Sequence, residues 1–185
     1  MAQQISVTMN DREFDVVARN TILLLLAFAT QDTADIKGTT TALDTAEVLL
    51  HVWYSALIPS GVLSWLQERV KPLIAEVCGR IADKPPNSIF SKTWEFSAGQ
   101  TLRLILKKED WLQFREFLDI PNMTPEDAAR IRTSVTLAPE RADYRDRWYF
   151  KDTSPFMRAA KQRFREDGLL LPFGHPRIAF DMPNP

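Results

Sequence analysis

The sequence predicts a mainly α-helical fold: a multi-helix domain with one or two short edge strands. Apolar residues recur at the spacing of a helix over most of the 185 residues. Several of these runs follow helix-start signals, such as Thr124-Pro125. No Gly-x-Gly turn, typical of nucleotide-binding sheets, occurs anywhere in the chain. A truncated α/β domain, similar to a methyltransferase, is the alternative.

The most apolar stretch is residues 10–29, NDREFDVVARNTILLLLAFA. Asn10 and Glu13 have the spacing of a capping box at the start of a helix. The following apolar residues cover nearly every side of that helix, which predicts that it is buried at the centre of the domain. Its uninterrupted apolar part is too short to cross a bilayer, which needs about 20 residues.

Just before this stretch, residues 5–9 (ISVTM) alternate apolar and polar side chains, which predicts a short strand. A strand, an acidic residue and a buried helix make a βα unit. In nucleotide-binding α/β folds, an acidic residue at such a strand end binds ribose hydroxyls. Here that cofactor-binding residue would be Asp11.

The rest of the chain is divided into further helices by loops and prolines. Pro72 removes one main-chain donor and predicts a kink near residues 68–71 of its helix. The remaining expected elements are helices over 41–58, 60–81, 96–120 in two pieces, 124–137 and 154–167, connecting segments over 31–41 and 83–91, and a short strand over 177–180.

Composition limits the possible functions. Apolar residues make up 45% and the net charge is −1, so no overall field draws the chain to nucleic acid or a membrane. The single Cys78 excludes an internal disulfide and a cysteine-based zinc site. His51 and His175 leave little for metal or triad chemistry. We expect no metal, no cofactor, no membrane partner and a cytoplasmic location, with the nucleus as the alternative.

The chain divides into a helical core domain over residues 1–137 and a C-terminal part over 138–185. The C-terminal part begins with basic residues among aromatic ones, eight basic against three acidic over residues 141–165. Such a pattern is typical of nucleic-acid binding. We favour the interpretation that these cations cover an edge of the hydrophobic core and pair with acidic residues, because the whole chain is not basic. The basic residues are Arg141, Arg145, Arg147, Lys151, Arg158, Lys161, Arg163 and Arg165.

An apolar segment follows the last expected helix. Leu169, Leu170, Leu171 and Phe173 have no charged or strongly polar residue between them. Such a segment is buried either against the body of the protein or against another chain. These four residues are therefore candidates for an interaction surface.

Two stretches resemble an uncharacterised domain of fungal proteins. NDREFDVVARNTILLLLAF at residues 10–28 is similar to the helix after a strand in that domain, and SPFMRAAKQRFREDGLLLPFG at 154–174 is similar to a downstream segment. Those proteins often carry a MYND-type zinc finger, and a related domain occurs in a dynein axonemal assembly factor. This chain lacks the zinc-finger cysteines and the glycine turn. The resemblance therefore implies a fragment or shortened relative without a complete cofactor cradle.

The function that we predict is a non-enzymatic protein-interaction or scaffold domain of a larger fungal-type protein. It has no predicted catalytic residues, and its partner is another protein or a second copy. The first alternative is a degenerate S-adenosylmethionine-dependent methyltransferase-like domain, and the second is nucleic-acid binding through residues 141–165. Asn10, Arg19 and Asn20 are polar residues at or in the buried helix, and we expect them to have structural roles.

Overall fold

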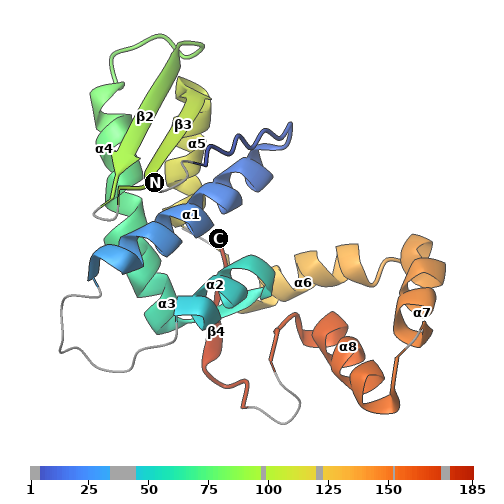
Figure 1. Cartoon of the computed structure of the whole chain (residues 1–185). Coiled ribbons are helices and arrows are strands. Elements are labelled where there is room, and N and C mark those ends of the chain that lie inside the picture. Colours follow the sequence, from blue (N-terminus) through green and yellow to red (C-terminus); the bar gives the residue numbers. More distant parts are fainter. Residues whose placement is uncertain (1–4, 34–44, 97–98, 120–122, 152, 172–175) are drawn as a thin grey trace.

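The computed structural model of the chain confirms the mainly α-helical fold with short strands. It describes residues 5–33, 45–96, 99–119, 123–151, 153–171 and 176–185. The elements are α1 (Phe14–Thr33), α2 (Thr45–Tyr54), β1 (Leu57–Pro59), α3 (Ser60–Trp65), the π-helical turn η1 (Leu66–Val70), α4 (Lys71–Arg80), β2 (Ile89–Glu95), β3 (Thr101–Lys107), α5 (Lys108–Asp119), α6 (Pro125–Thr136), the 3-10 turn η2 (Pro139–Arg141), α7 (Ala142–Phe150), α8 (Pro155–Asp167) and β4 (Phe180–Pro183). In Figure 1, α6, α7 and α8 extend as an arm from a body of the earlier elements.

The expected buried helix is α1, which packs against η1 and α2. Its buried face carries Ala18, Ile22, Leu25 and Leu26, each at most 1% exposed, and half-buried side chains flank this face. The helix begins at Phe14, three residues later than a cap at Asn10 predicts. The Glu13 N–H donates instead to the Asp11 carboxylate at 2.9 Å. No helix in the described part of the chain is long and apolar enough to span a bilayer.

The strand predicted at residues 5–9 is wrong. These residues are described, but they form no strand and are exposed to solvent. Alternation of side chains makes a strand only where a neighbouring strand takes its main-chain groups. Neither of the two sheets in the described residues includes this segment.

The predicted helix over residues 60–81 is confirmed, and so is its irregularity before Pro72. The helical turns α3, η1 and α4 follow one another without a break, and η1 is a π-helical turn directly before Lys71. Pro72 has no N–H for the carbonyl four residues earlier, at Glu68. The widened turn lies at the point where that hydrogen bond is missing. Residues 66 and 70 of η1 are buried against the core.

Sequence reasoning missed the hairpin of β2 and β3. It assigned residues 96–106 to a helix, and it assigned residues 89–91, at the start of β2, to a linker. The two strands pair antiparallel from Ile89 opposite Lys107 to Glu95 opposite Thr101. Gly99, with φ of 79°, lies in the connecting turn and adopts a conformation that other residues rarely take. The alternation in TLRLILK, residues 101–107, was the signal for a strand.

The helix after the hairpin, α5, agrees with the predicted aromatic stripe. Trp111, Phe114 and Leu118 are at most 1% exposed, and Phe14 of α1 meets Phe114 edge to face at 6.3 Å between ring centroids. The inward residues of the hairpin, with Trp94 the most buried, cover the same core. The core of the protein therefore lies between α1, the helical run from α3 to α4, α5 and the hairpin.

The helices α6 and α8 begin as the sequence predicted, whereas α7 was not predicted, because no helix-start signal or apolar stripe marks residues 142–150. Thr124 and Asp127 form a capping box at the start of α6, and the Ser154 hydroxyl accepts from the Met157 N–H at the start of α8. Gly168 ends α8 in the left-handed conformation. Within the described residues of α7 and α8, no side chain is buried. The arm thus has regular helices with little core of their own.

The chain returns to the body through β4, which pairs antiparallel with β1. The sequence placed a strand at residues 177–180; the structure places it at Phe180–Pro183. The strand β1 was assigned to the end of a helix over 41–58, but α2 ends at Tyr54. The first residues of that predicted helix, 41–44, lie outside the described residues.

Gly168 provides a test of the connection between α6 and α8. Its φ is 75°, and a Cβ added there would lie 2.6 Å from Arg132 Cδ, whose side chain reaches the end of α8. Left-handed backbone with a Cβ costs about 1–2 kcal/mol. We expect Gly168→Ala to lower the free energy of unfolding by at least about that amount in urea titrations.

The matched control is Gly79→Ala in α4, where an added Cβ meets nothing within 4 Å. Alanine in place of glycine in a helix stabilises by about 0.5–1 kcal/mol, so this variant should gain stability. Equal effects of the two substitutions would show that the backbone at Gly168 does not hold the arm in place.

Candidate functional site

The residues selected from the sequence are not gathered in one place. Asn10 and Asp11 are exposed ahead of α1, and Asp11 uses its carboxylate on the Glu13 N–H. Asn20 is half-buried on α1. Of the apolar segment after α8, Leu169 is buried, Leu170 is 39% exposed and Leu171 is half-buried, whereas Phe173 lies outside the described residues.

Arg19 lies where three distant segments meet, at the C-terminal end of α2. Its guanidinium donates from Nη1 to the Val52 carbonyl at 2.9 Å and from Nη2 to the main-chain oxygen of Pro185 at 2.6 Å. Burial lowers the pKa of Arg19, and the carboxylate of Asp15 opposes that shift. The side chain therefore joins α1 to both α2 and the end of β4.

Asn184 binds the same helix end from the other side. Its Nδ2 donates to three carbonyls, those of His51 at 3.2 Å, Val52 at 3.0 Å and Ser55 at 2.7 Å. Its main-chain N–H donates to the Ala56 carbonyl at 3.1 Å. The last carbonyls of a helix have no partner within it, and these donors satisfy them.

The segment after α8 reaches the same place. The Leu170 N–H donates to the Ser55 hydroxyl at 3.2 Å, and the Ala56 N–H donates to the Gly168 carbonyl at 2.8 Å. Ser55 is 3% exposed, so its hydroxyl serves this internal contact. We call Arg19, His51, Ser55 and Asn184 together the α2 anchor.

His51 completes the α2 anchor from inside the protein. It is 3% exposed, its Nδ1 lies 3.0 Å from the Ser55 hydroxyl, and its Nε2 lies 3.7 Å from a carboxylate oxygen of Glu47. Its ring meets the edge of Phe180 of β4 at 4.8 Å between centroids. Burial lowers the pKa of His51, and the Glu47 carboxylate opposes the shift.

Serine, histidine and glutamate in contact resemble a nucleophilic triad, but the surroundings favour another role. A serine nucleophile needs N–H donors around the oxyanion that forms on its substrate. Here Ser55 lies at the C-terminal end of α2, where the negative end of the helix dipole repels an oxyanion, and the Leu170 N–H beside it already donates to the Ser55 hydroxyl. The arrangement therefore binds hydrogen-bond donors from the C-terminal part of the same chain.

A second group of residues forms an exposed surface on the arm. Tyr144 is 61% exposed, Phe150 63%, Phe156 63% and Met157 49%. The first two lie on α7 and the last two on α8. We call these four residues the arm surface. Isolated exposed apolar residues are ordinary, but here four large ones lie on two short helices that contact each other.

The cations of the arm mostly bind within it. Lys161 and Arg165 lie over the Trp148 ring, 4.7 and 4.8 Å from its centroid, and Arg158 lies 5.3 Å from that of Phe150. Arg132 of α6 donates to the carbonyls of Phe164, Arg165 and Glu166 at the end of α8. The basic residues of this region therefore hold α6, α7 and α8 together.

The other titratable candidates lie in the core or apart from one another. Cys78 is buried, its Sγ donates to the Trp111 carbonyl at 3.2 Å, and burial raises its pKa, which disfavours the reactive thiolate. Across the described ranges, no three histidine, cysteine, aspartate or glutamate side chains are grouped so that they could hold a metal ion.

Comparison with known proteins gives one match. Residues 1–58 match the model of a domain of unknown function (DUF4470). The matched part includes α1, α2 and the first two residues of β1, and with them Arg19, His51 and Ser55 of the α2 anchor. No curated protein and no solved structure matches the chain.

Sequence reasoning singled out two of the four anchor residues. Arg19 and His51 were visible because they interrupt apolar helices. Ser55 and Asn184 were missed, because a hydroxyl at a helix end and an amide between two prolines are common in loops. Only the pairing of β4 with β1 brings Asn184 to α2.

The buried His51 predicts how stability depends on pH. Its folded-state pKa is lowered, so the unfolded chain binds a proton more readily near its pKa of about 6.5. Stability is then full above that value and is lost as pH falls through it, by at most about 1.4 kcal/mol per pH unit. Urea unfolding at pH 7.5 and 5.5 should show the decrease, and His51→Gln should remove most of it. An undiminished decrease in His51→Gln would assign it to other groups.

Asn184 tests the contribution of donors at the end of α2. Asn184→Ala removes the side-chain donor to the Ser55 carbonyl, which costs about 1–3 kcal/mol, while Arg19 still donates to the Val52 carbonyl. Asn184→Asp keeps the size but places a carboxylate against those carbonyls, so we expect a larger loss of stability than with alanine. Thermal unfolding of both variants measures the order, and an aspartate variant as stable as the parent would contradict it.

Proposed function

We propose that this chain is a non-enzymatic protein-interaction domain that serves as a scaffold in a larger protein. The observation that carries the proposal is the arm surface: Tyr144, Phe150, Phe156 and Met157 are each about half exposed or more. Aromatic residues and methionine are enriched in the centres of protein interfaces. All four side chains lie on the short helices α7 and α8, where solvent and a partner can reach them.

The way in which the arm is held supports this role. Arg132 binds the end of α8 through main-chain carbonyls, and Lys161 donates to the Trp148 carbonyl at 3.0 Å and to the Thr153 hydroxyl at 2.8 Å. Such contacts fix the directions of the helices, while the four side chains of the arm surface stay about half exposed or more. The expected partner has an apolar face that meets these exposed aromatic and methionine side chains.

The two alternative functions have less support. For nucleic-acid binding, cations and aromatic rings must be free to meet phosphates and bases. Lys161, Arg165 and Arg158 instead lie over aromatic rings of the arm itself. For a methyltransferase-like domain, Asp11 should follow a strand, and residues 5–9 are not one. Calorimetry with S-adenosylmethionine and gel shifts at low salt test these two alternatives directly.

The biological context that we propose is the one implied by the resemblance to the fungal domain. The larger protein is of the fungal type whose members often carry a MYND-type zinc finger, with a relative in a dynein axonemal assembly factor. It acts in the cytoplasm. Leu169, one of the residues expected in the docking surface, is 4% exposed, so the arm surface takes over the role given to residues 169–173.

The proposal is tested by removing apolar side chains from the arm surface. We expect Tyr144→Ser with Met157→Ser to reduce retention of the specific partner from a fungal cell extract by roughly 30-fold. Two central interface side chains together contribute about 2 kcal/mol or more. Quantitative mass spectrometry of proteins captured on the immobilised chain gives the ratio.

The matched control is Ile105→Ser on β3, which is 53% exposed and lies on the hairpin rather than the arm. It should retain the partner as the parent chain does. If the arm variant and the control capture the same proteins in the same amounts, the arm surface is not the docking site.

A further inference from the structure

The segment before α1 has the pattern of a strand, but neither sheet of the described residues includes it. Ile5 and Val7 are each 78% exposed and Met9 is 57% exposed. These residues and Asp11 share one phase of the alternation, so in an extended chain they point to the same side. That side is apolar up to Met9 and acidic at Asp11. In the monomer, this segment exposes apolar side chains to water and makes no hydrogen bonds to the strands of either sheet.

The hairpin offers an open strand edge. The Phe96 N–H donates to the Gln100 carbonyl at 3.0 Å, and the Lys108 N–H donates to the Ser88 carbonyl at 2.9 Å, so even-numbered residues of β2 pair with β3. The main-chain groups of Ile89, Ser91 and Thr93 therefore point to the opposite edge. In the described part of the chain, the sheet has only these two strands, and an open edge accepts another strand.

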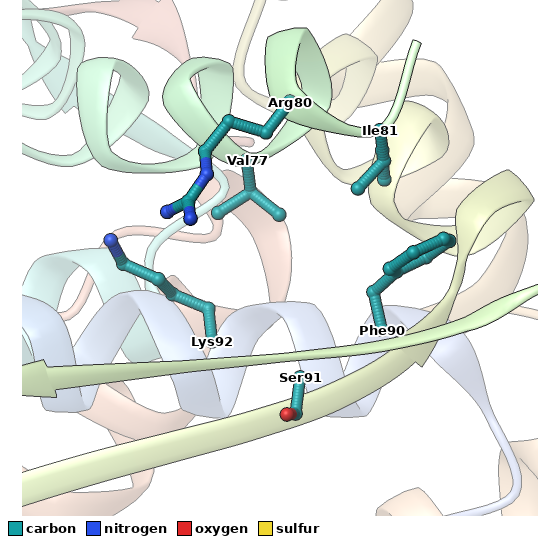
Figure 2. A pocket seen from close by; sticks show the side chains of 6 residues that line it. All are labelled: Val77, Arg80, Ile81, Phe90, Ser91 and Lys92. Carbon is teal, nitrogen blue, oxygen red and sulfur yellow. The ribbon is translucent and has the colours of Figure 1, made fainter. Parts of the chain in front are cut away.

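A hollow lies beside this edge, between β2 and α4. Its volume is about 210 Å³, and Figure 2 shows the six side chains that line it. Ligand pockets are usually 300 Å³ or more, so this hollow suits one apolar side chain rather than a whole small molecule. The lining residues are Val77, Arg80 and Ile81 from α4 and Phe90, Ser91 and Lys92 from β2.

The two ends of the hollow differ in character. Ile81 and Phe90 face each other at one end, Arg80 and Lys92 approach each other at the other, and Ser91 points to the far side of the strand (Figure 2). Glu76 is the carboxylate that binds both cations, at 3.1 Å from Lys92 and 3.4 Å from Arg80. Two positive charges share one negative charge, so a net positive charge remains that can bind a second carboxylate.

The apolar end and the basic end of the hollow follow one another in the order that matches the side chains of the segment before α1. Phe90 and Lys92 are two residues apart on β2, about 6.6 Å along a strand. A strand that lies parallel to β2 places an apolar residue at Phe90 and, two residues later, an acidic residue at Lys92. Met9 and Asp11 have this spacing and this order.

We propose that residues 5–11 of a second copy of this chain add as a strand to the open edge of β2. Met9 enters the hollow between Ile81 and Phe90, and Asp11 binds Arg80 and Lys92. Exchange in both directions closes a symmetric dimer. This surface lies on the hairpin and α4, so the proposal goes beyond the protein-binding role of the arm, and either of the two can fail alone.

The test is the molar mass of the intact chain by light scattering over a hundredfold range of concentration. We expect a concentration-dependent dimer, and we expect Met9→Ser and Asp11→Lys each to weaken it by about tenfold or more. Met9 is exposed, so Met9→Ser removes no internal packing, and circular dichroism checks that Asp11→Lys, which removes the acceptor of the Glu13 N–H, keeps its helices. Thr8→Lys, on the opposite side of the same segment, is the matched control and should leave the dimer intact.

Reversing the charges on both sides distinguishes the specific pairing from nonspecific association. Arg80→Glu with Lys92→Glu should also weaken the dimer, and mixing this variant with Asp11→Lys should restore mixed dimers by pairing the reversed charges. Circular dichroism checks that the Arg80 and Lys92 variant is folded. A monomer at every concentration, or a dimer that Met9→Ser and Asp11→Lys leave unchanged, overturns the proposal.

Discussion

The connection between the body and the tail depends on the carbonyl groups at the C-terminal end of α2. A buried helix end without donors costs stability, and this one receives donors from segments that lie far apart in the sequence. Arg19 comes from α1, and Asn184 comes from the end of the tail. The helix could have ended in a local glycine cap. Instead its end is completed only when the tail has returned, which makes the docking of β4 part of the folding of the body.

The same requirement explains why the arm is regular yet open. The end that follows α8 is fixed to the body by the pairing of β4 with β1. Within the arm, the helices are joined by guanidinium and ammonium groups that bind carbonyls and aromatic rings, as Arg132 and Lys161 do. Cations with long stems can join helices that have almost no core between them. The apolar residues of α7 and α8 therefore remain at the surface.

Sequence reasoning predicted the elements whose signals are local. The capping box at Thr124, the proline at 155 and the glycine at 168 were recognised, because each acts within its own turn. It failed at residues 89–107, where a run of leucines was taken for a helix although the alternation and Gly99 favoured a hairpin. It had no means to find the α2 anchor. Asn184 acquires its role through a pairing of strands more than a hundred residues apart, and no local pattern records such a pairing.

Residues 5–9 and residues 101–107 show what decides the fate of an alternating segment. Both alternate apolar and polar side chains, but only the second has a neighbour, six residues upstream across a tight turn, to take its hydrogen bonds. A strand is a property of two segments, and the sequence of one alone is insufficient. Among the described residues, the first segment has no such neighbour, and β2 has a strand on one edge alone. A mainly α-helical protein with these two features has complementary strand-forming parts that its own fold does not join.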